Sequence, residues 1–322
     1  AAVTRSGQLM HPFWHRKRVL VTGGAGFVGR AVVAALRRRG VAEADIVVPR
    51  SRDCDLRQVE HCRAAMRGCH IVIHLAAPTG NVDYSRAHPA SQYRDCSLIN
   101  VNLFEAAREA AVDKVISVGN LLAYPATVAP PFREETVRDG QVAADYLGIG
   151  LSKRQLLDLA ELHHAEFGLN AVTVLGANAY GPHDHFDGIQ AHVIPSTIVK
   201  CLRDEDLVVW GDGTPTRDFL FVDDLADGVL LAAERLEPRG FVNLSSGTEI
   251  AIADLVRLIA KLCGFTRPIT FDASRGGGDR RRVASTARAT SLVGFVPAVP
   301  MEEGLRRTID WYRHAILSTA TS

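Results

Sequence analysis

The sequence predicts an α/β protein built on a doubly wound parallel sheet. Short apolar runs alternate along the chain with segments of helical periodicity, and a glycine-rich turn follows the first of these runs. Strands that are buried on both faces are continuous apolar runs, and strands separated by helices pair in parallel. The 322 residues are enough for one large domain or two smaller ones.

The expected elements follow in chain order. A helix is predicted at about 28–38, and the apolar runs predict strands at 18–22, 45–48, 70–75, 114–118 and 171–175. After about residue 181 the alternation gives way to loops rich in proline and glycine, with short strands at 207–210 and 241–244. We therefore expect a dinucleotide-binding domain over residues 1–180 and a smaller substrate-binding lobe over 181–322, with some exchange of strands between them.

The composition argues against several classes of protein. The 37 basic and 36 acidic residues give a net charge of +1, so no nucleic-acid partner is expected. The apolar runs are too short to span a membrane, and the first 17 residues lack the apolar core of an export signal. None of the six cysteines forms a C-x-x-C pair, so free thiols are expected. We expect a cytoplasmic protein without a membrane partner.

The segment Thr22–Gly29 places a G-x-x-G-x-x-G pattern between the first strand and the first helix. Glycines at these places let a pyrophosphate approach backbone N–H groups at the helix N-terminus. A plain glycine turn is the alternative, but the position between strand and helix favours a Rossmann-type dinucleotide site. The residues expected to bind the dinucleotide are Gly23, Gly26, Phe27 and Val28.

Two arginines follow the second strand, about twenty residues beyond the glycine pattern. A carboxylate at this place binds the ribose 2′-OH of NAD, whereas an arginine suits the 2′-phosphate of NADP. Arg50 and Arg52 therefore favour NADP, and two solvated surface arginines are the alternative. Asp55, Leu56 and Ala76 fit positions that contact the adenine and the diphosphate side of the cofactor.

Four short motifs carry a resemblance to a known family: Thr22–Gly29, His74–Ala77, Gly150–Lys153 and Asn178–Pro182. Together they resemble the extended short-chain dehydrogenase/reductases that act on nucleotide sugars, the NAD-dependent epimerase/dehydratase family. The stretches 181–195 and 209–224 are similar to the GDP-L-fucose synthase family, whose members are NADP-dependent epimerase/reductases. The resemblance covers roughly residues 17–315 and implies a GDP-linked sugar as substrate.

The resemblance implies roles for several residues. Lys153 matches the lysine that holds the nicotinamide ribose and tunes the catalytic tyrosine, and His192 matches the acid of the epimerisation steps. Arg217 matches an arginine positioned for the nucleotide diphosphate. The substrate contacts implied are Asn178, His183, Asp184, His192, Trp210 and Arg217. The family's four-helix contact, here from residues 101–111 and 153–167, implies a homodimer.

Four functional positions of the family carry different residues in this chain. Asn120 stands in place of the catalytic serine and Leu122 in place of a cysteine. Cys96 stands in place of an asparagine, and Ile149 in place of the tyrosine. Ile149 lies four residues, about one helical turn, before Lys153 and has no proton to give. Ordinary keto reduction is therefore disfavoured, because hydride transfer lacks its protonation partner.

These substitutions favour a redox-neutral isomerase that acts on a GDP-hexose or GDP-6-deoxyhexose. The reaction would be epimerisation, or interconversion of pyranose and furanose rings. NADP is expected to bind, with or without a role in the reaction. The residues expected to act are His192, Lys153, Asn120 and Tyr124.

A divalent metal ion is a further candidate cofactor. The side chains of His183, His185 and Asp187 alternate along the chain, so they would share one side of an extended segment. The alternative is that this loop holds only substrate contacts and solvated residues.

Two other functions stay open. The first is an NADP-dependent GDP-4-keto-6-deoxymannose 3,5-epimerase/4-reductase, in which Tyr146 or Tyr124 gives the proton. Tyr146 lies seven residues before Lys153, and the glycines at 148 and 150 are expected to weaken any helix there. The second is a nucleotide-sugar-binding protein without catalysis.

Overall fold

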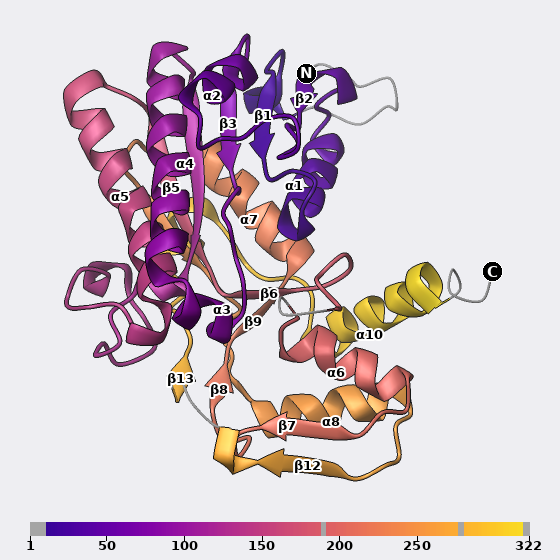
Figure 1. Ribbon diagram of the computed structural model, residues 1–322. Helices are drawn as coiled ribbons and strands as arrows, with labels where there is room; N and C mark the ends of the chain where they lie inside the picture. The colour runs from indigo at the N-terminus through magenta and orange to yellow at the C-terminus, as the bar shows by residue number, and fades with distance from the viewer. Residues whose placement is uncertain (1–10, 188–190, 276–279, 318–322) are drawn as a thin grey trace.

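The computed structural model describes residues 11–187, 191–275 and 280–317 (Figure 1). A six-stranded sheet of order β10-β5-β4-β3-β1-β2 forms its larger part, and every neighbouring pair is parallel. The strands are β1 (Val19–Thr22), β2 (Ile46–Val47), β3 (Ile71–His74), β4 (Lys114–Asn120), β5 (Ala171–Gly176) and β10 (Phe241–Leu244).

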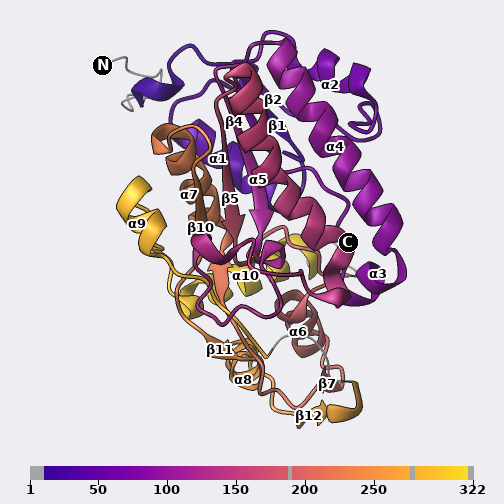
Figure 2. The same cartoon turned by 90° about the vertical axis from the view of Figure 1, so that its left-hand side faces the viewer.

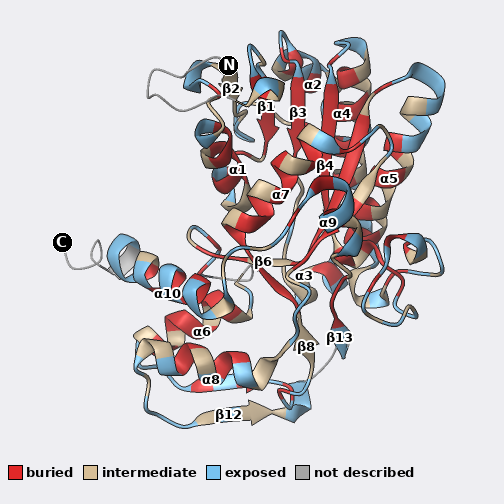
Figure 3. Ribbon diagram, turned by 180° about the vertical axis from the view of Figure 1, so that it is seen from behind, coloured by how far each residue is buried: buried red, intermediate tan, exposed pale blue. Residues whose placement is uncertain are grey.

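Helices cover both faces of this sheet (Figures 1 and 2). One face carries α2 (Val59–Met66), α4 (Pro89–Glu109) and α5 (Leu147–Phe167), and the other carries α1 (Phe27–Arg38) and α7 (Val222–Arg235). Alternate residues of β1 supply the two cores: Val19 and Val21 pack on the α1 side, and Leu20 packs on the α2 side. The strands β1, β3 and β5 are accordingly buried along their length, whereas the edge strand β2 is half-buried (Figure 3). The predicted doubly wound α/β class is confirmed.

The smaller part lies beyond the carboxyl ends of these strands. Its parallel pair β7 (Leu207–Trp210) and β12 (Ile269–Asp272) lies beside α6 (Val193–Leu202) and α8 (Ile252–Cys263), with α10 (Met301–Tyr312) above them in Figure 1. The short strands that lead into it are β6 (Asn178–Tyr180), β8 (Thr216–Arg217), β9 (Phe219–Phe221), β11 (Ile250–Ala251) and β13 (Arg281–Arg282). The remaining α-helices are α3 (Val82–Ala87) and α9 (Ala287–Val293). None of the helices in the described ranges has both the length and the apolarity that a bilayer span requires.

The two parts are not consecutive in sequence. α7 and β10 follow residue 181, yet α7 packs on β4 and β5, and β10 forms the edge of the large sheet. A boundary at residue 180 would therefore separate these two elements from the layer in which they pack. The division into residues 1–180 and 181–322 stays a prediction.

The first turn of α5 depends on two glycines. The expectation that Gly148 and Gly150 weaken a helix here is wrong, because α5 begins at Leu147 and includes both. A Cβ at Gly148 would lie 2.2 Å from the carbonyl oxygen of Pro89, and one at Gly150 would lie 2.7 Å from that of Leu122. The glycines therefore let α5 approach the backbone of α4 and of the loop after β4, which outweighs their low helix propensity.

Replacing Gly148 with alanine is expected to destabilise the fold. The added methyl group must displace the Pro89 carbonyl, and such overpacking lowers the free energy of unfolding by about 1–3 kcal/mol. Urea denaturation measures the change. Glu166→Ala, an exposed substitution on the same helix, is the control and is expected to stay within about 0.5 kcal/mol of the parent. Equal stability of Gly148→Ala and the parent would contradict the close approach.

Candidate functional site

A cleft of about 660 Å³ lies at the carboxyl ends of the parallel strands, between the two parts of the molecule. Ligands of open α/β sheets bind at this edge. Its walls come from the glycine turn after β1, the ends of β3, β4 and β5, the first turn of α5, and α6. The cleft brings together many of the predicted residues: Gly23, Gly26, Phe27, Val28, Ala76, Asn120, Lys153, Asn178, Asp184, His192, Trp210 and Arg217.

The glycine turn is closed so tightly that side chains are excluded. Gly23 has φ +69°, and a Cβ there would lie 3.0 Å from the backbone nitrogen of Ala76. A Cβ at Gly29 would lie 2.1 Å from the carbonyl oxygen of Gly23. Gly26, the residue before α1, has no side chain to cap the helix, so the N-terminal N–H groups are left to bind an anion.

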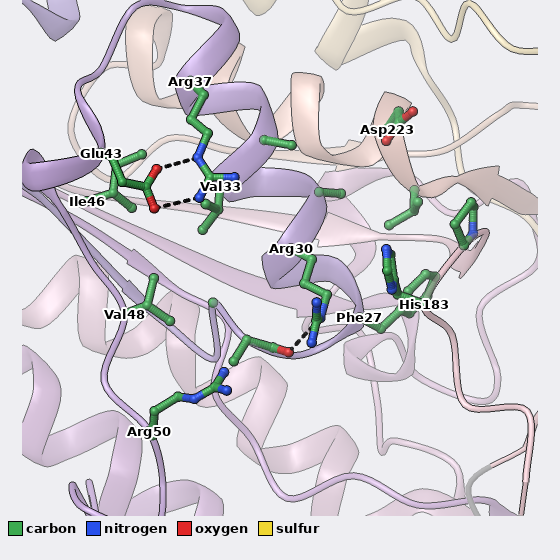
Figure 4. A pocket seen from close by; sticks show the side chains of 16 residues that line it. Phe27, Arg30, Val33, Arg37, Glu43, Ile46, Val48, Arg50, His183 and Asp223 are labelled. Atoms are coloured by element: carbon green, nitrogen blue, oxygen red, sulfur yellow. Dashed lines mark hydrogen bonds and ion pairs between the residues drawn. The ribbon is translucent and has the colours of Figure 1, made fainter. Parts of the chain in front are cut away.

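A second cavity, of about 580 Å³, lies on the outer side of the glycine turn (Figure 4). Figure 4 shows Arg30 and His183 beside Phe27, and the ion pair of Arg37 with Glu43 at the other end. Arg50 also lines this cavity, and its side chain forms no ion pair or hydrogen bond with the described residues.

The other residues predicted to bind the cofactor lie elsewhere. Arg52 pairs with Asp53 at 3.0 Å in an exposed position, and Asp55 pairs with Arg57. Leu56 packs in the core between the sheet and α2. None of Arg52, Asp55 and Leu56 lines either cavity.

Lys153 is buried at the cleft wall, and its Nζ donates to the carbonyl oxygen of Val118 at 3.4 Å. Burial lowers the pKa of this ammonium. Ile149, one turn earlier in α5, lines the cleft and is 3% exposed. A hydrocarbon thus occupies the wall beside Lys153. The nearest phenol along the chain is Tyr146, the residue before α5, which also lines the cleft and carries the Arg282 guanidinium 5.3 Å from its ring centre.

A buried chain of hydrogen bonds, which the sequence did not reveal, lies behind Lys153. His74 Nδ1 is 2.8 Å from Thr22 Oγ1, and His74 Nε2 is 3.0 Å from Asn100 Oδ1. The Asn100 amide donates in turn to the carbonyl oxygen of Ser152 at 3.0 Å. Burial lowers the pKa of His74 to about 4, so the imidazole is neutral at pH 7. His74 and Asn100 are polar residues within an otherwise apolar strand and helix. That pattern in the sequence could have predicted these buried hydrogen bonds.

Asn120 is held by a local hydrogen bond. Its Oδ1 accepts from the backbone nitrogen of Leu122 at 3.1 Å, which caps the short 3-10 helix Leu121–Ala123. Because Oδ1 is engaged, the amide NH₂ is the part of the side chain that can donate to a ligand in the cleft.

Tyr124, predicted as a catalytic residue, does not line the cleft. Its side chain is 3% exposed, stacks on Phe132 at 4.8 Å and donates from its hydroxyl to Asn243 Oδ1 at 2.9 Å. Burial raises the pKa of this phenol. The 3-10 helix after β4 turns Tyr124 into the core, so its ring does not line the cleft.

His192 immediately precedes α6 and is exposed within the cleft. The protein around it removes part of its hydration, and His185 lies close enough to repel a second positive charge. Both effects lower the pKa of the His192 imidazole, and the loss of hydration has the larger effect. Asp184, in the turn after β6, is buried, and burial raises the pKa of this carboxyl to about 7.

The predicted metal site is not formed. The chain turns at His183, which has φ +68°, so the alternating side chains do not share one side. His183 lies 4.7 Å from the Trp311 ring, His185 lines the cleft, and Asp187 faces Arg203 at 3.7 Å. No group of three histidine, cysteine, aspartate or glutamate side chains that could hold a metal exists in the part of the chain that the structure describes.

Two arginines lie side by side in the wall of the cleft. Arg217 of β8 and Arg282 of β13 are register partners on parallel strands, and both line the cleft. Trp210, 55% exposed, also lines the cleft, with the Arg275 guanidinium 5.4 Å from its ring centre. Arg217 and Trp210, both predicted to contact the substrate, thus line the cleft. Arg282 is a further cation in the cleft that was not predicted from the sequence.

The model of the NAD dependent epimerase/dehydratase family matches residues 19–244. The chain belongs to this family. Its similarity extends to the GDP-L-fucose synthase of Sinorhizobium fredii, at 29% identity over 91% of this chain and 95% of the relative. The GDP-L-fucose synthase of Escherichia coli is also 29% identical, over 92% of this chain and 97% of the relative.

Solved structures of the family have the same fold. A UDP-glucose 4-epimerase from Thermotoga maritima, with UDP-glucose, gives a TM-score of 0.83 at 26% identity, covering 92% of this chain and 99% of that one. A GDP-L-fucose synthetase from Naegleria fowleri gives a TM-score of 0.82 at 26% identity, covering 94% of each chain.

The His192 imidazole is expected to titrate below 6.5, the ordinary histidine value. NMR titration of the ring protons, assigned with His192→Asn, measures the midpoint. Replacing His185 with glutamine removes the second imidazole and is expected to raise this midpoint. Between the lowered pKa and 6.5 the unfolded chain binds more protons than the folded one, so the contribution of His192 to stability falls as the pH falls through this window. A midpoint at or above 6.5 would refute the proposed environment.

Proposed function

We propose that this protein is a redox-neutral epimerase of a GDP-linked keto sugar. The observation that carries the proposal is the wall beside Lys153, where Ile149 offers no proton while His192 keeps an accessible imidazole in the same cleft. Reduction of a ketone needs a proton donor at the carbonyl oxygen, whereas epimerisation next to a ketone needs a base at carbon. The full-length similarity to proteins named GDP-L-fucose synthase supports a GDP-linked sugar as substrate.

The chemistry follows from the residues in the cleft. Neutral His192 would take the proton from the carbon next to the ketone, and the lowered pKa keeps this imidazole neutral at pH 7. The electron pair moves to the ketone oxygen, where the Asn120 NH₂ can donate a hydrogen bond to the developing negative charge. Lys153 adds a positive charge at the same wall. Arg217 and Arg282 are suited to the diphosphate of the nucleotide.

The residues present fit a bound NADP. The glycine turn, which added Cβ atoms would fill, leaves the N-terminus of α1 open for a pyrophosphate, and Arg50 lies beside the turn for a 2′-phosphate. NADP supplies hydride chemistry when bound. The proton transfers proposed for His192 do not depend on that chemistry.

A second candidate function is NADP-dependent epimerisation followed by reduction. The observation that favours it is the half-buried Tyr146 in the cleft, one turn before Ile149. A phenol there could protonate a carbonyl oxygen in place of the family's tyrosine. Ring interconversion, the other isomerase reaction considered, loses support because its expected metal ligands do not gather.

Proton exchange with solvent tests the proposed reaction. In D₂O with GDP-4-keto-6-deoxymannose, the protein is expected to place deuterium on a carbon next to the carbonyl and to form an epimer, without consuming added NADPH. NMR and mass spectrometry follow the sugar, and absorbance follows NADPH. Stoichiometric NADPH oxidation that is lost in Tyr146→Phe would establish the second function instead. Tight binding of the nucleotide sugar without any turnover would identify a non-catalytic binder.

Substitutions in the cleft should separate the two proposed roles. His192→Asn removes the base and is expected to slow exchange by about 10²–10⁴-fold. Asn120→Ala removes one donor to the enolate and is expected to cost about 10²–10³-fold. His164→Asn, on α5 and outside the cleft, is the control. Unchanged exchange in His192→Asn would exclude the histidine as the base.

Arg50 and Arg52 make a matched pair for the cofactor. Arg50→Ala is expected to weaken NADP binding by about 10–100-fold, because a charged hydrogen bond to the 2′-phosphate is lost, and to leave NAD binding unchanged. Arg52→Ala is the control, since Arg52 is exposed and pairs with Asp53. Titration calorimetry measures both. If Arg50→Ala lost affinity for NADP and NAD equally, Arg50 would not be the residue that binds the 2′-phosphate.

We also propose that the protein forms a homodimer through α4 and α5. These helices lie side by side on one face of the sheet (Figures 1 and 2). Large apolar side chains on them are exposed in the single chain: Tyr93, Leu98, Val101, Leu162 and Phe167. Burying such a set between two copies would remove it from water.

A further inference from the structure

Arg154 of α5 donates from all three of its guanidinium nitrogens to the loop that follows β4. Its Nε and one terminal nitrogen donate to the carbonyl oxygen of Ala123, at 2.9 and 2.8 Å. The other terminal nitrogen donates to the carbonyl oxygen of Gly140 at 2.9 Å. The planar guanidinium presents its donors in a fixed fork, so this half-buried side chain holds two points of the loop in one geometry relative to α5.

The residue before Arg154 contacts the chain on the other side of Asn120. Lys153 Nζ donates to the carbonyl oxygen of Val118, which precedes Asn120 on β4. Arg154 binds the carbonyl of Ala123, which follows Asn120 in the loop. Two consecutive residues of α5 therefore hold the backbone on both sides of Asn120.

The direction of the Asn120 side chain depends on the segment that Arg154 holds. Asn120 Oδ1 accepts from the backbone nitrogen of Leu122, in the middle of the 3-10 helix that ends at Ala123. A single turn of 3-10 helix is held only weakly by its own hydrogen bonds, so contacts from α5 decide how it is oriented. Rotation of this turn would move the Leu122 nitrogen and, with it, the amide group of Asn120.

We infer that Arg154 is a positioning residue that acts on the reaction through Asn120. Arg154 does not line the cleft, so it makes no direct contact with a ligand there. By binding the Ala123 carbonyl, it fixes the turn that directs the Asn120 NH₂ toward the oxygen of the enolate. The catalytic consequence rests on the proposed function, in which this NH₂ stabilises the enolate, whereas the placement of the amide does not.

Arg154→Gln tests the inference in D₂O with GDP-4-keto-6-deoxymannose. Glutamine cannot replace three guanidinium nitrogens, and the kcat of deuterium exchange is expected to fall by about 10–100-fold, the cost of a misplaced group. KM is expected to stay within about twofold, because the arginines suited to the diphosphate are unchanged. Arg154→Lys, which can still bind one carbonyl, is expected to recover part of kcat. Thermal denaturation checks that both variants fold. A parental kcat in Arg154→Gln would overturn the inference.

A double substitution separates positioning from a general loss of structure. When Asn120 is already alanine, Arg154→Gln is expected to slow exchange by less than about threefold, because the side chain that it positions is absent. If Arg154 only supported the fold, its replacement would cost the same factor with and without Asn120. Equal losses in the two backgrounds would therefore overturn the inference.

Arg138 provides a matched control. It also joins the loop after β4 to α5, through exposed ion pairs with Asp158 at 2.6 Å and with Glu161 at 3.3 Å. Exposed ion pairs contribute little, so Arg138→Gln is expected to leave the kcat of exchange unchanged. A loss in Arg138→Gln as large as that in Arg154→Gln would show that any loosening of the loop slows the reaction, and the specific role of Arg154 would be refuted.

NMR of the Asn120 side-chain amide tests the placement without turnover. The NH₂ signals, assigned with Asn120→Ala, are expected to shift in Arg154→Gln and Arg154→Lys and to stay in place in Arg138→Gln. Unchanged signals in the Arg154 variants would overturn the inference whatever the activity. If the parent protein catalysed no exchange but the signals shifted as expected, the proposed function would be refuted and the placement of the amide by Arg154 would be supported.

Discussion

The cleft depends on one buried chain of hydrogen bonds at the carboxyl edge of the sheet. Through His74, this chain joins Thr22 at the end of β1 to Asn100 of α4, and through Asn100 it reaches the backbone of α5 at Ser152. Thr22 Oγ1 also accepts from the backbone nitrogens of Leu75 and Ala76, at 3.2 and 3.3 Å. Buried polar groups are stable only when they are paired, so the chain fixes the glycine turn relative to the helix that carries Lys153.

The second constraint is steric. Gly148 and Gly150 bring the first turn of α5 against the backbone of α4 and of the loop after β4, which places Ile149 and Lys153 at the cleft wall. Strands, helices and the glycine turn are specified by local patterns, so the doubly wound fold could be predicted from the sequence. A glycine that is needed because a carbonyl oxygen distant in sequence packs against it has no such local pattern. Helix propensity alone predicted that Gly148 and Gly150 weaken the helix, whereas both lie within it.

The site was predictable where a residue's place follows from a strand end or a helix face. Lys153, Asn120 and the glycine turn are of this kind, and they line the cleft. Prediction failed where a short turn decides the direction of a side chain. The 3-10 helix after β4 sends Tyr124 into the core, and the left-handed backbone at His183 separates the supposed metal ligands. Asp184 belongs to the same loop, and only its burial, which sequence spacing does not reveal, distinguishes it from the exposed residues beside it.

The isoleucine at position 149 also changes the electrostatic selectivity of the cleft. The positive charge of Lys153 would lower the pKa of a phenol beside it, and the phenolate would partly neutralise that charge. A hydrocarbon side chain neither ionises nor forms hydrogen bonds with water, so it leaves the charge of Lys153 unopposed. The positive potential of Lys153 then acts on whichever ligand oxygen lies next to it, in a wall of low polarity. A ligand whose oxygen gains negative charge is held more strongly there than the same ligand in its neutral form. The cleft would therefore discriminate between charge states of one molecule, and stable anions that resemble an enolate should bind more tightly than the ketone itself.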